Sequence, residues 1–209
     1  MFTEKTIRQF TEELASSAPV PGGGSAAALA GATAAGLVSM VCSLTMGKEK
    51  FRDVEPEIRW QFEQSESLRR EMLDLLEADT QVYSRVMAAY RLPRATDDEK
   101  RARAAAIQTA LKEACDVPMA IARACAKIID LCPGATDKGN VAAVSDAGVG
   151  AVLAAAALES AALNVDINLA SIKDEAFVSA TSREMGQLIA SKVALKDEVL
   201  RNVKGKLGG

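Results

Sequence analysis

Asp79 interrupts an otherwise apolar helical pattern, which makes it the first candidate for chemistry in this sequence. The pattern repeats every three or four residues, the spacing of one buried helix face. Its members are Leu68, Met72, Leu75, Asp79, Val82 and Val86. A carboxylate on such a face is costly unless it has hydrogen-bond donors or a cation, or faces a cavity. Two interpretations stay open: a structural aspartate bonded to a neighbouring helix, or a site residue.

A second group of polar side chains lies on one face of the apolar segment 140–172. At about 100° per residue its four members fall within about 40° of one another. They are Asp146, Ser160, Asn164 and Asn168. If Ser145 or Asp146 instead caps the N-terminus of this helix, the group loses its first member. Asp146 and Asn164 lie about 27 Å apart along a straight helix, so one chain cannot join them in one site unless a symmetric partner does.

A glycine-rich turn precedes the other apolar segment. It consists of Pro21, Gly22, Gly23, Gly24 and Ser25. Exposed backbone N–H groups at a helix start can bind a carboxylate or phosphate, although close helix packing explains the glycines equally well. The turn has neither the lysine spacing nor the preceding strand of known nucleotide-binding loops.

Basic residues follow the far end of that apolar helix. Lys48 and Lys50 lie just after Gly47, where they either cap the helix C-terminus or form an anion-binding cluster.

Composition excludes several classes of function. The 209 residues contain no histidine, so imidazole catalysis and the commonest metal ligand are absent. With 25 basic and 28 acidic residues and no long basic tract, we expect no nucleic-acid partner. We expect no membrane span either, because Gly, Ala, Ser and Thr dilute the uncharged segment 25–46. The four cysteines are expected to be buried free thiols, and the protein cytoplasmic.

These groups need helices to position them. Helical patterns are predicted at 3–16, 25–46, 56–90, 96–132, 140–172 and from 174 onward. Pro118 is expected to kink or split the fourth helix, and Pro133 to end it. The prediction is one all-α domain, residues 1–209, forming an antiparallel bundle of six or seven helices around two buried Ala/Gly-rich helices.

The segment APVPGGGSAAALAGATAAGLVSMVCSLTMGKEKF resembles the signature of the cyclodeaminase/cyclohydrolase family, to which the C-terminal domain of formiminotransferase-cyclodeaminase belongs. Asp79 with its helix, the segment LPRATDDEKRARAAAIQTALKEACDVPMAIA and the segments GNVAAVSDAGVGA and NVDINLASI are similar to the family in the same order. The similarity is greatest to bacterial members that hydrolyse methenyltetrahydrofolate. Phe51, Glu49 and Ala142 depart from the family pattern, which weakens any role carried over to positions 51 and 142.

The resemblance implies an all-α homodimer that binds a tetrahydrofolate derivative as substrate, without a metal or redox cofactor. It implies hydrolysis of 5,10-methenyltetrahydrofolate to 10-formyltetrahydrofolate in one-carbon metabolism. The alternatives are a formiminotetrahydrofolate cyclodeaminase that releases ammonia, and a non-catalytic folate-binding or scaffold protein.

The candidate residues divide into two roles under this hypothesis. Asp79 and Asp146 are the candidate proton acceptors, and Lys48 or an amide donor is the candidate for stabilising the adduct. The predicted substrate-binding residues are Pro21, Gly22, Gly23, Gly24, Ser25, Lys50, Asn140, Ser145, Asn164 and Asn168. We expect the glycine turn with Lys48 or Lys50 to receive the glutamate tail.

Overall fold

The computed structural model describes residues 1–208, which form α-helices and short 3₁₀ helices with no β-strand in that range. The prediction of an all-α fold is confirmed. The α-helices are α1 (Ile7–Leu14), α2 (Gly23–Ser43), α3 (Glu55–Tyr90), α4 (Asp97–Lys138), α5 (Val144–Leu169) and α6 (Glu175–Lys206). The 3₁₀ helices are η1 (Phe2–Glu4), η2 (Glu49–Val54) and η3 (Val141–Ala143).

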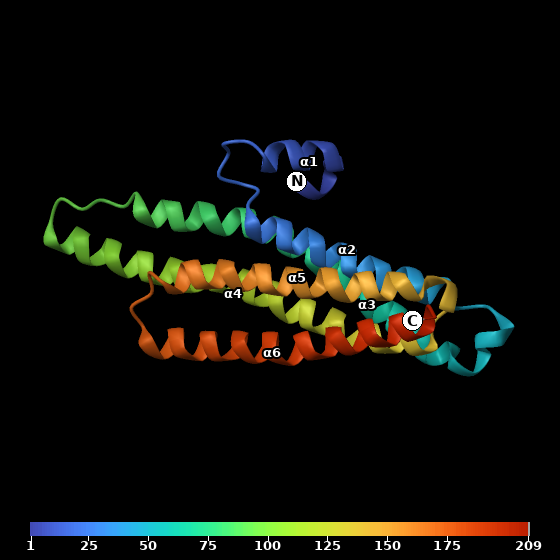
Figure 1. The fold of residues 1–209 in the computed structure, drawn as a ribbon. Coiled ribbons are helices and arrows are strands. Elements are labelled where there is room, and N and C mark those ends of the chain that lie inside the picture. The colour runs from blue at the N-terminus through green and yellow to red at the C-terminus, as the bar shows by residue number, and fades with distance from the viewer. Residues whose placement is uncertain (209) are drawn as a thin grey trace.

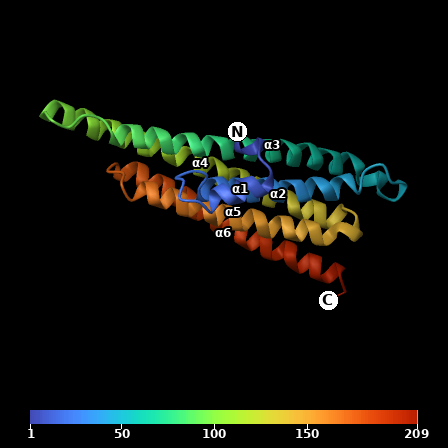
Figure 2. The same ribbon diagram turned by 90° about the horizontal axis from the view of Figure 1, so that it is seen from above.

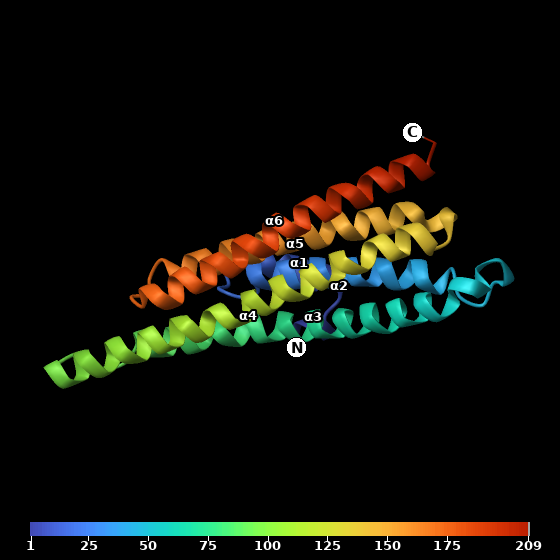
Figure 3. The same ribbon diagram turned by 90° about the horizontal axis from the view of Figure 1, so that it is seen from below.

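Helices α2 to α6 run side by side along one elongated bundle, and α1 lies against its flank (Figures 1 and 2). The connection between α3 and α4 projects at one tip, and η2 projects past the opposite end (Figures 1 and 3). Helix α2 packs against α3 and α5, while α5 also contacts α4 and α6. The two small-residue helices therefore lie against each other.

Small residues let the central helices approach closely. A Cβ atom added at Gly31 of α2 would overlap the Met72 side chain of α3. One added at Gly150 of α5 would lie 3.2 Å from the Ala34 carbonyl oxygen of α2. Larger side chains would separate these helices, so the Ala/Gly content sets the spacing of the core.

Helix α4 departs most from the predicted boundaries. It runs without interruption from Asp97 to Lys138, so the predicted end at Pro133 was wrong and Pro118 does not split it. A proline removes one backbone hydrogen bond, and for Pro118 a neighbouring helix compensates, because Asn168 of α5 donates to the Ala114 carbonyl. Near the C-terminus of α4, Lys206 of α6 donates to the Thr136 carbonyl.

The N-terminal segment was also predicted incorrectly. Instead of one helix over 3–16 the chain forms η1 and then α1, because Thr6 caps α1 with a reciprocal hydrogen bond to Gln9. In α2 the last helical residue is Ser43, and Gly47 follows in a turn with a φ of 72°. Thr96 and Glu99 form a capping box at the start of α4, and the four cysteines are buried free thiols, as predicted.

One side of α2 and α5 remains exposed although both helices were predicted to be buried. We call this surface the α2–α5 face. It comprises Gly23, Ala26, Ala30, Thr33, Leu37, Met40 and Leu44 of α2, and Val149, Val152, Ala156, Ser160, Leu163 and Ile167 of α5. Leu163 and Ile167 are 71% and 73% exposed. Gly23–Ser43 and Val141–Leu169 are long and apolar enough to cross a membrane, although 61% and 56% of their most apolar windows are buried in the bundle.

Candidate active site

The predicted site residues lie near the two ends of α2. These ends are about 30 Å apart, because the helix has 21 residues. The glycine end is where α2 begins, and it holds the glycine turn together with Asp79, Asn164 and Asn168. The lysine end is where α2 finishes, and it holds Lys48, Lys50, Asn140, Ser145 and Asp146. Helices α2 and α5 are antiparallel, so each contributes residues to both ends.

Asp79 lies directly against the first turn of α2. The Ser25 hydroxyl donates to Oδ2 of Asp79 over 2.7 Å. A Cβ atom added at Gly24 would overlap Oδ1 of the same carboxylate. Glycine at position 24 is thus required for the aspartate to approach the helix. Both sequence interpretations of Asp79 hold in part, because it bonds a neighbouring helix and also faces a cavity.

The protonation of Asp79 is shifted by its surroundings. Burial raises the pKa of its carboxyl group above the ordinary value, and hydrogen bonds from the Ser25 hydroxyl and backbone partly offset that effect. A carboxyl group with a raised pKa is a stronger proton acceptor than an exposed one. Its own carboxylate also occupies the position where the glycine turn was expected to bind an anion.

A cavity of about 310 Å³ opens beside Asp79. Helices α2, α3, α4 and α5 all contribute to its wall. The lining residues are Pro19, Val20, Gly22, Gly23, Gly24, Asp79, Val82, Tyr83, Val86, Ala114, Pro118, Asn164, Ile167 and Asn168. Within the described part of the chain, none of these lining side chains carries a positive charge.

Two amides of α5 face the cavity from fixed positions. The Asn164 side chain donates to the Ser160 carbonyl, and a Cβ atom at Gly23 would lie 3.5 Å from it. Asn168 donates to the carbonyls of Asn164 and Ala114. Because Pro118 has no N–H, it leaves the Ala114 carbonyl without its helical donor, and Asn168 supplies one from the next helix.

The lysine end is held together by the carbonyl that ends α2. Lys48 and Asn140 both donate to the Leu44 carbonyl, over 2.6 and 3.1 Å. The prediction that Lys48 caps the C-terminus of α2 is confirmed. Its role in stabilising the reaction adduct stays a prediction. The Lys50 ammonium lies 4.6 Å from the centre of the Phe51 ring.

The first of the four polar residues predicted on one face of α5, Asp146, lies inside the helix and not at its N-cap. Asp146 lies in the first turn, and the N-cap is Ala143, so the alternative that Ser145 or Asp146 caps this helix was wrong. Ser145 borders a groove with Val149 and Leu200. The 3₁₀ turn η3, which Asn140 caps through the Ala142 N–H, shifts the start of α5 to Val144.

Sequence reasoning missed Tyr83 and Pro118 as cavity residues. Tyr83 follows Asp79 by one helical turn, so the helical spacing was available as a signal. The place of Pro118 depends on how α4 packs against α5, and no local pattern indicates that.

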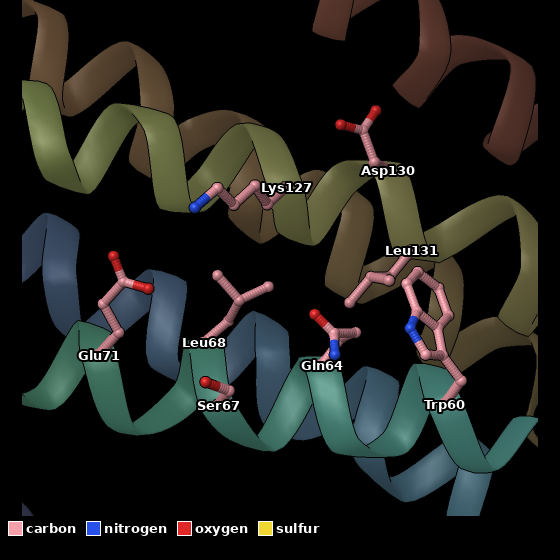
Figure 4. A pocket seen from close by; sticks show the side chains of 8 residues that line it. All are labelled: Trp60, Gln64, Ser67, Leu68, Glu71, Lys127, Asp130 and Leu131. Atoms are coloured by element: carbon pink, nitrogen blue, oxygen red, sulfur yellow. The ribbon is translucent and has the colours of Figure 1, made fainter.

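A second hollow of about 270 Å³ lies between α3 and α4, away from the predicted residues (Figure 4). Trp60 and Leu131 lie together at one end, and Lys127 extends toward the Glu71 side (Figure 4). Asp130 on its rim is paired with Lys192 of α6. None of the predicted site residues lines it, so the glycine end remains the candidate active site.

The sequence matches one family model, described as Formiminotransferase-cyclodeaminase, over residues 6–187. It is 47% identical to a methenyltetrahydrofolate cyclohydrolase of Methylorubrum extorquens, over 99% of this chain and 100% of the relative. It is 31% and 33% identical to formimidoyltransferase-cyclodeaminases of Sus scrofa and Dictyostelium discoideum, over 88% and 93% of the chain. The matches cover only 34% and 35% of those two longer proteins.

The fold is similar to a solved structure over its whole length. The formiminotetrahydrofolate cyclodeaminase of Thermotoga maritima superposes with a TM-score of 0.81. The two chains are 30% identical, and the match covers 99% of this chain and 98% of the other.

Proposed function

The chain belongs to the formiminotransferase-cyclodeaminase family, and we propose from this premise that it hydrolyses 5,10-methenyltetrahydrofolate to 10-formyltetrahydrofolate. The full-length similarity to a methenyltetrahydrofolate cyclohydrolase supports this choice of reaction. The observation that carries the mechanism is the Asp79 carboxyl group, which faces the cavity at the glycine end.

The proposed reaction needs one proton acceptor. The substrate carries a positive charge delocalised over N5, the bridging carbon and N10. Water attacks the carbon, a C–O bond forms, and Asp79 accepts the proton that the water loses. The neutral adduct then collapses: the C–N5 bond breaks, the hydroxyl proton moves to N5, and the formyl group stays on N10. The overall reaction releases one proton.

The surroundings of Asp79 suit both steps. An ionised Asp79, which is half-buried, stabilises the substrate cation. The Ser25 hydroxyl orients the carboxylate, and the amides of Asn164 and Asn168 supply polar groups for the ring system. Water attack on a cation requires no metal or redox group, so the proposed mechanism uses none.

A second candidate reaction is the release of ammonia from formiminotetrahydrofolate. The Thermotoga maritima structure, a formiminotetrahydrofolate cyclodeaminase that superposes on the whole chain, favours it. In this second reaction, N10 of formiminotetrahydrofolate attacks the formimino carbon, and an acid protonates the departing ammonia. Both reactions pass through an adduct at the same carbon, so the same carboxyl group serves either.

A paired assay separates the candidates. The purified protein is mixed with 5,10-methenyltetrahydrofolate, and the near-ultraviolet absorption of the substrate is followed. We expect the absorption to disappear at a rate proportional to enzyme concentration. Ammonia release from the formimino substrate would establish the second candidate instead. A shifted band without turnover would identify a folate-binding protein and contradict both reactions.

The assembly and compartment are part of the same proposal. We propose a homodimer, supported by the exposed apolar side chains of the α2–α5 face. We propose the cytoplasm as the compartment, supported by the four buried cysteines, which are free thiols.

A further inference from the structure

Tyr83 is the one aromatic side chain that lines the glycine-end cavity within residues 1–208. The proposed reaction gives it no role. Its side chain is 42% exposed, whereas Val82, Ala114 and Pro118 of the same cavity are buried. These three residues therefore form the floor of the cavity. Tyr83 lies at its rim together with the exposed Pro19.

Tyr83 lies on the same side of α3 as the proposed proton acceptor. It follows Asp79 by four residues, which corresponds to about 6 Å along the helix axis and about 40° around it. A group in contact with Tyr83 must therefore lie close to the reacting carbon in the substrate. Two ring systems meet this condition. The aminobenzoyl ring is bonded to N10, and the pterin contains N5.

The amides of α5 discriminate between these two rings. Asn168 donates its two N–H groups to the carbonyls of Ala114 and Asn164, over 3.1 and 3.0 Å. A side-chain amide has two N–H groups and one oxygen, so the oxygen of Asn168 is the atom that can bond a ligand, as an acceptor. Asn164 donates to the Ser160 carbonyl and keeps its own oxygen as an acceptor.

These acceptors match the pterin better than the aminobenzoyl ring. One edge of the pterin carries an amino group beside a ring N–H, and both are donors. The aminobenzoyl ring carries no donor on its ring atoms, so it gains most from an aromatic neighbour. The pterin therefore belongs at Asn164 and Asn168, and the aminobenzoyl ring at Tyr83.

The size of the cavity agrees with this orientation. Its volume of about 310 Å³ is at the lower end of the roughly 300–1,000 Å³ that small-molecule sites occupy, so it suits the ring systems without the glutamate. An aminobenzoyl ring at the rim directs the glutamate that follows it away from the cavity floor. The two carboxylates then avoid Asp79, which is the charged side chain on the described wall.

We propose that Tyr83 is a specificity-determining residue, which stacks on the aminobenzoyl ring at the cavity rim while the oxygens of Asn164 and Asn168 accept hydrogen bonds from the pterin. Tyr83 thereby holds the bridging carbon beside Asp79. The inference rests on the proposed function for the identity of the substrate. Because the stacked ring does not react, the contact is equally strong in the substrate and in the transition state. It therefore lowers KM without changing kcat.

The first test compares Tyr83→Leu with Tyr83→Phe. Leucine keeps an apolar side chain but removes the ring, so KM should rise by about 10-fold while kcat stays within about twofold of wild type. Phenylalanine keeps the ring and should keep the wild-type KM. An unchanged KM in Tyr83→Leu would overturn the proposal.

Tyr90 provides the matched control. It lies on the same helix and is 41% exposed, but it does not line the cavity. Tyr90→Leu should therefore keep the wild-type KM and kcat. A rise in KM equal to that of Tyr83→Leu would attribute the effect to the helix surface and contradict a contact between Tyr83 and the substrate.

The second test examines the orientation with two fragments of the substrate, used as competitive inhibitors. Tyr83→Leu should weaken inhibition by p-aminobenzoylglutamate by about 10-fold. Inhibition by 6-methyltetrahydropterin should stay within about twofold of wild type, because this fragment lies at the amides of α5. The reverse pattern would show that the pterin stacks on Tyr83 and would overturn the orientation.

The third test measures binding without turnover, so it separates this inference from the proposed function. 5-Formyltetrahydrofolate, which contains both ring systems, is titrated into each variant by calorimetry. Its Kd should rise by about 10-fold in Tyr83→Leu and stay unchanged in Tyr83→Phe. This result would support the role of Tyr83 even if the wild type hydrolysed no methenyltetrahydrofolate. Equal Kd values for Tyr83→Leu and an active wild type would contradict that role and leave the proposed function intact.

Discussion

The ionised form of Asp79 destabilises the folded chain, because burial raises the pKa of its carboxyl group. The cost is absent below the unfolded pKa, where both states are protonated, and is fully present above the raised folded pKa. Asp79→Asn should therefore lower kcat/KM by about 100- to 10,000-fold while leaving the melting temperature at pH 7 equal or higher. Any gain in melting temperature should vanish as the pH falls through this window.

The matched control for this change is Asp74→Asn. Asp74 lies on the same helix but is exposed, so its removal should alter neither activity nor the pH dependence of melting. The measurements are initial rates and thermal melts from pH 3 to pH 8. An Asp79→Asn variant with nearly wild-type turnover would remove Asp79 from the mechanism.

Gly24 is the residue that allows Asp79 to reach α2. A Cβ atom at Gly24 would overlap the carboxylate, whereas one at Gly22 would meet nothing within 4 Å. Gly24→Ala should displace Asp79 and reduce kcat/KM by at least about 10-fold, which corresponds to the loss of one charge-assisted hydrogen bond. Gly22→Ala should keep kcat/KM within about twofold of wild type, because the added Cβ atom meets nothing within 4 Å, although it replaces the glycine N-cap of α2 and should lower the melting temperature slightly. Equal effects of the two substitutions would contradict this account.

The residue-level prediction from sequence succeeded where the signal was a break in a pattern. Asp79 was singled out because it interrupts an apolar helical pattern, and the structure places it at a cavity. The role of the glycine turn was less predictable. The hydroxyl and the backbone of Ser25 bond Asp79 of the same chain, and the close approach of residues 24 and 79 depends on how α2 packs on α3.

At the scale of elements, the prolines of α4 show how one helix positions another. Because Pro118 has no N–H, the Ala114 carbonyl is free to accept a hydrogen bond from Asn168, which lines the cavity. Pro118→Ala should restore the helical donor to that carbonyl and weaken its bond to Asn168. We expect kcat/KM to fall by about fivefold, the equivalent of one ordinary hydrogen bond, mainly through a higher KM.

Pro133 supplies the internal control for this prediction. It also lies inside α4 but outside the cavity wall. Pro133→Ala should therefore change the helix in the same way without changing KM. Steady-state kinetics with circular dichroism of both variants would decide the matter, and identical KM values would show that Pro118 does not position Asn168.

Helix existence was predictable from apolar spacing, but helix continuity was not. The sequence around Pro133 and Gly134 carries the ordinary signals of a helix end, yet α4 continues to Lys138. Its final carbonyls are bonded by Lys206, which follows Thr136 by 70 residues. Such tertiary support decides the boundary and leaves no mark in the local sequence. The exposed side of α2 and α5 was missed for a related reason, since a uniformly small and apolar helix does not indicate which side faces solvent.

At the scale of the whole molecule, the length of the bundle determines what one chain can do. A substrate held at the glycine end cannot touch Lys48 of the same copy, because α2 separates them by about 30 Å. In the homodimer proposed above, with the α2–α5 face as its interface, folding would be coupled to association, and stability should depend on protein concentration.

This coupling gives a prediction that needs no substrate. In a dimer whose unfolding separates the copies, a tenfold rise in protein concentration adds about 1.4 kcal/mol of stability per dimer. For two 209-residue chains that raises the melting temperature by about 1–2 °C. Leu163→Glu places a charge on the α2–α5 face near its glycine end, so this variant should be monomeric and melt at a lower temperature that does not change with concentration. Ile7→Glu, equally exposed but on α1, should keep the wild-type dependence. Light scattering and melts over a hundredfold range of concentration make the measurement, and a Leu163→Glu variant that remains dimeric would exclude this face as the interface.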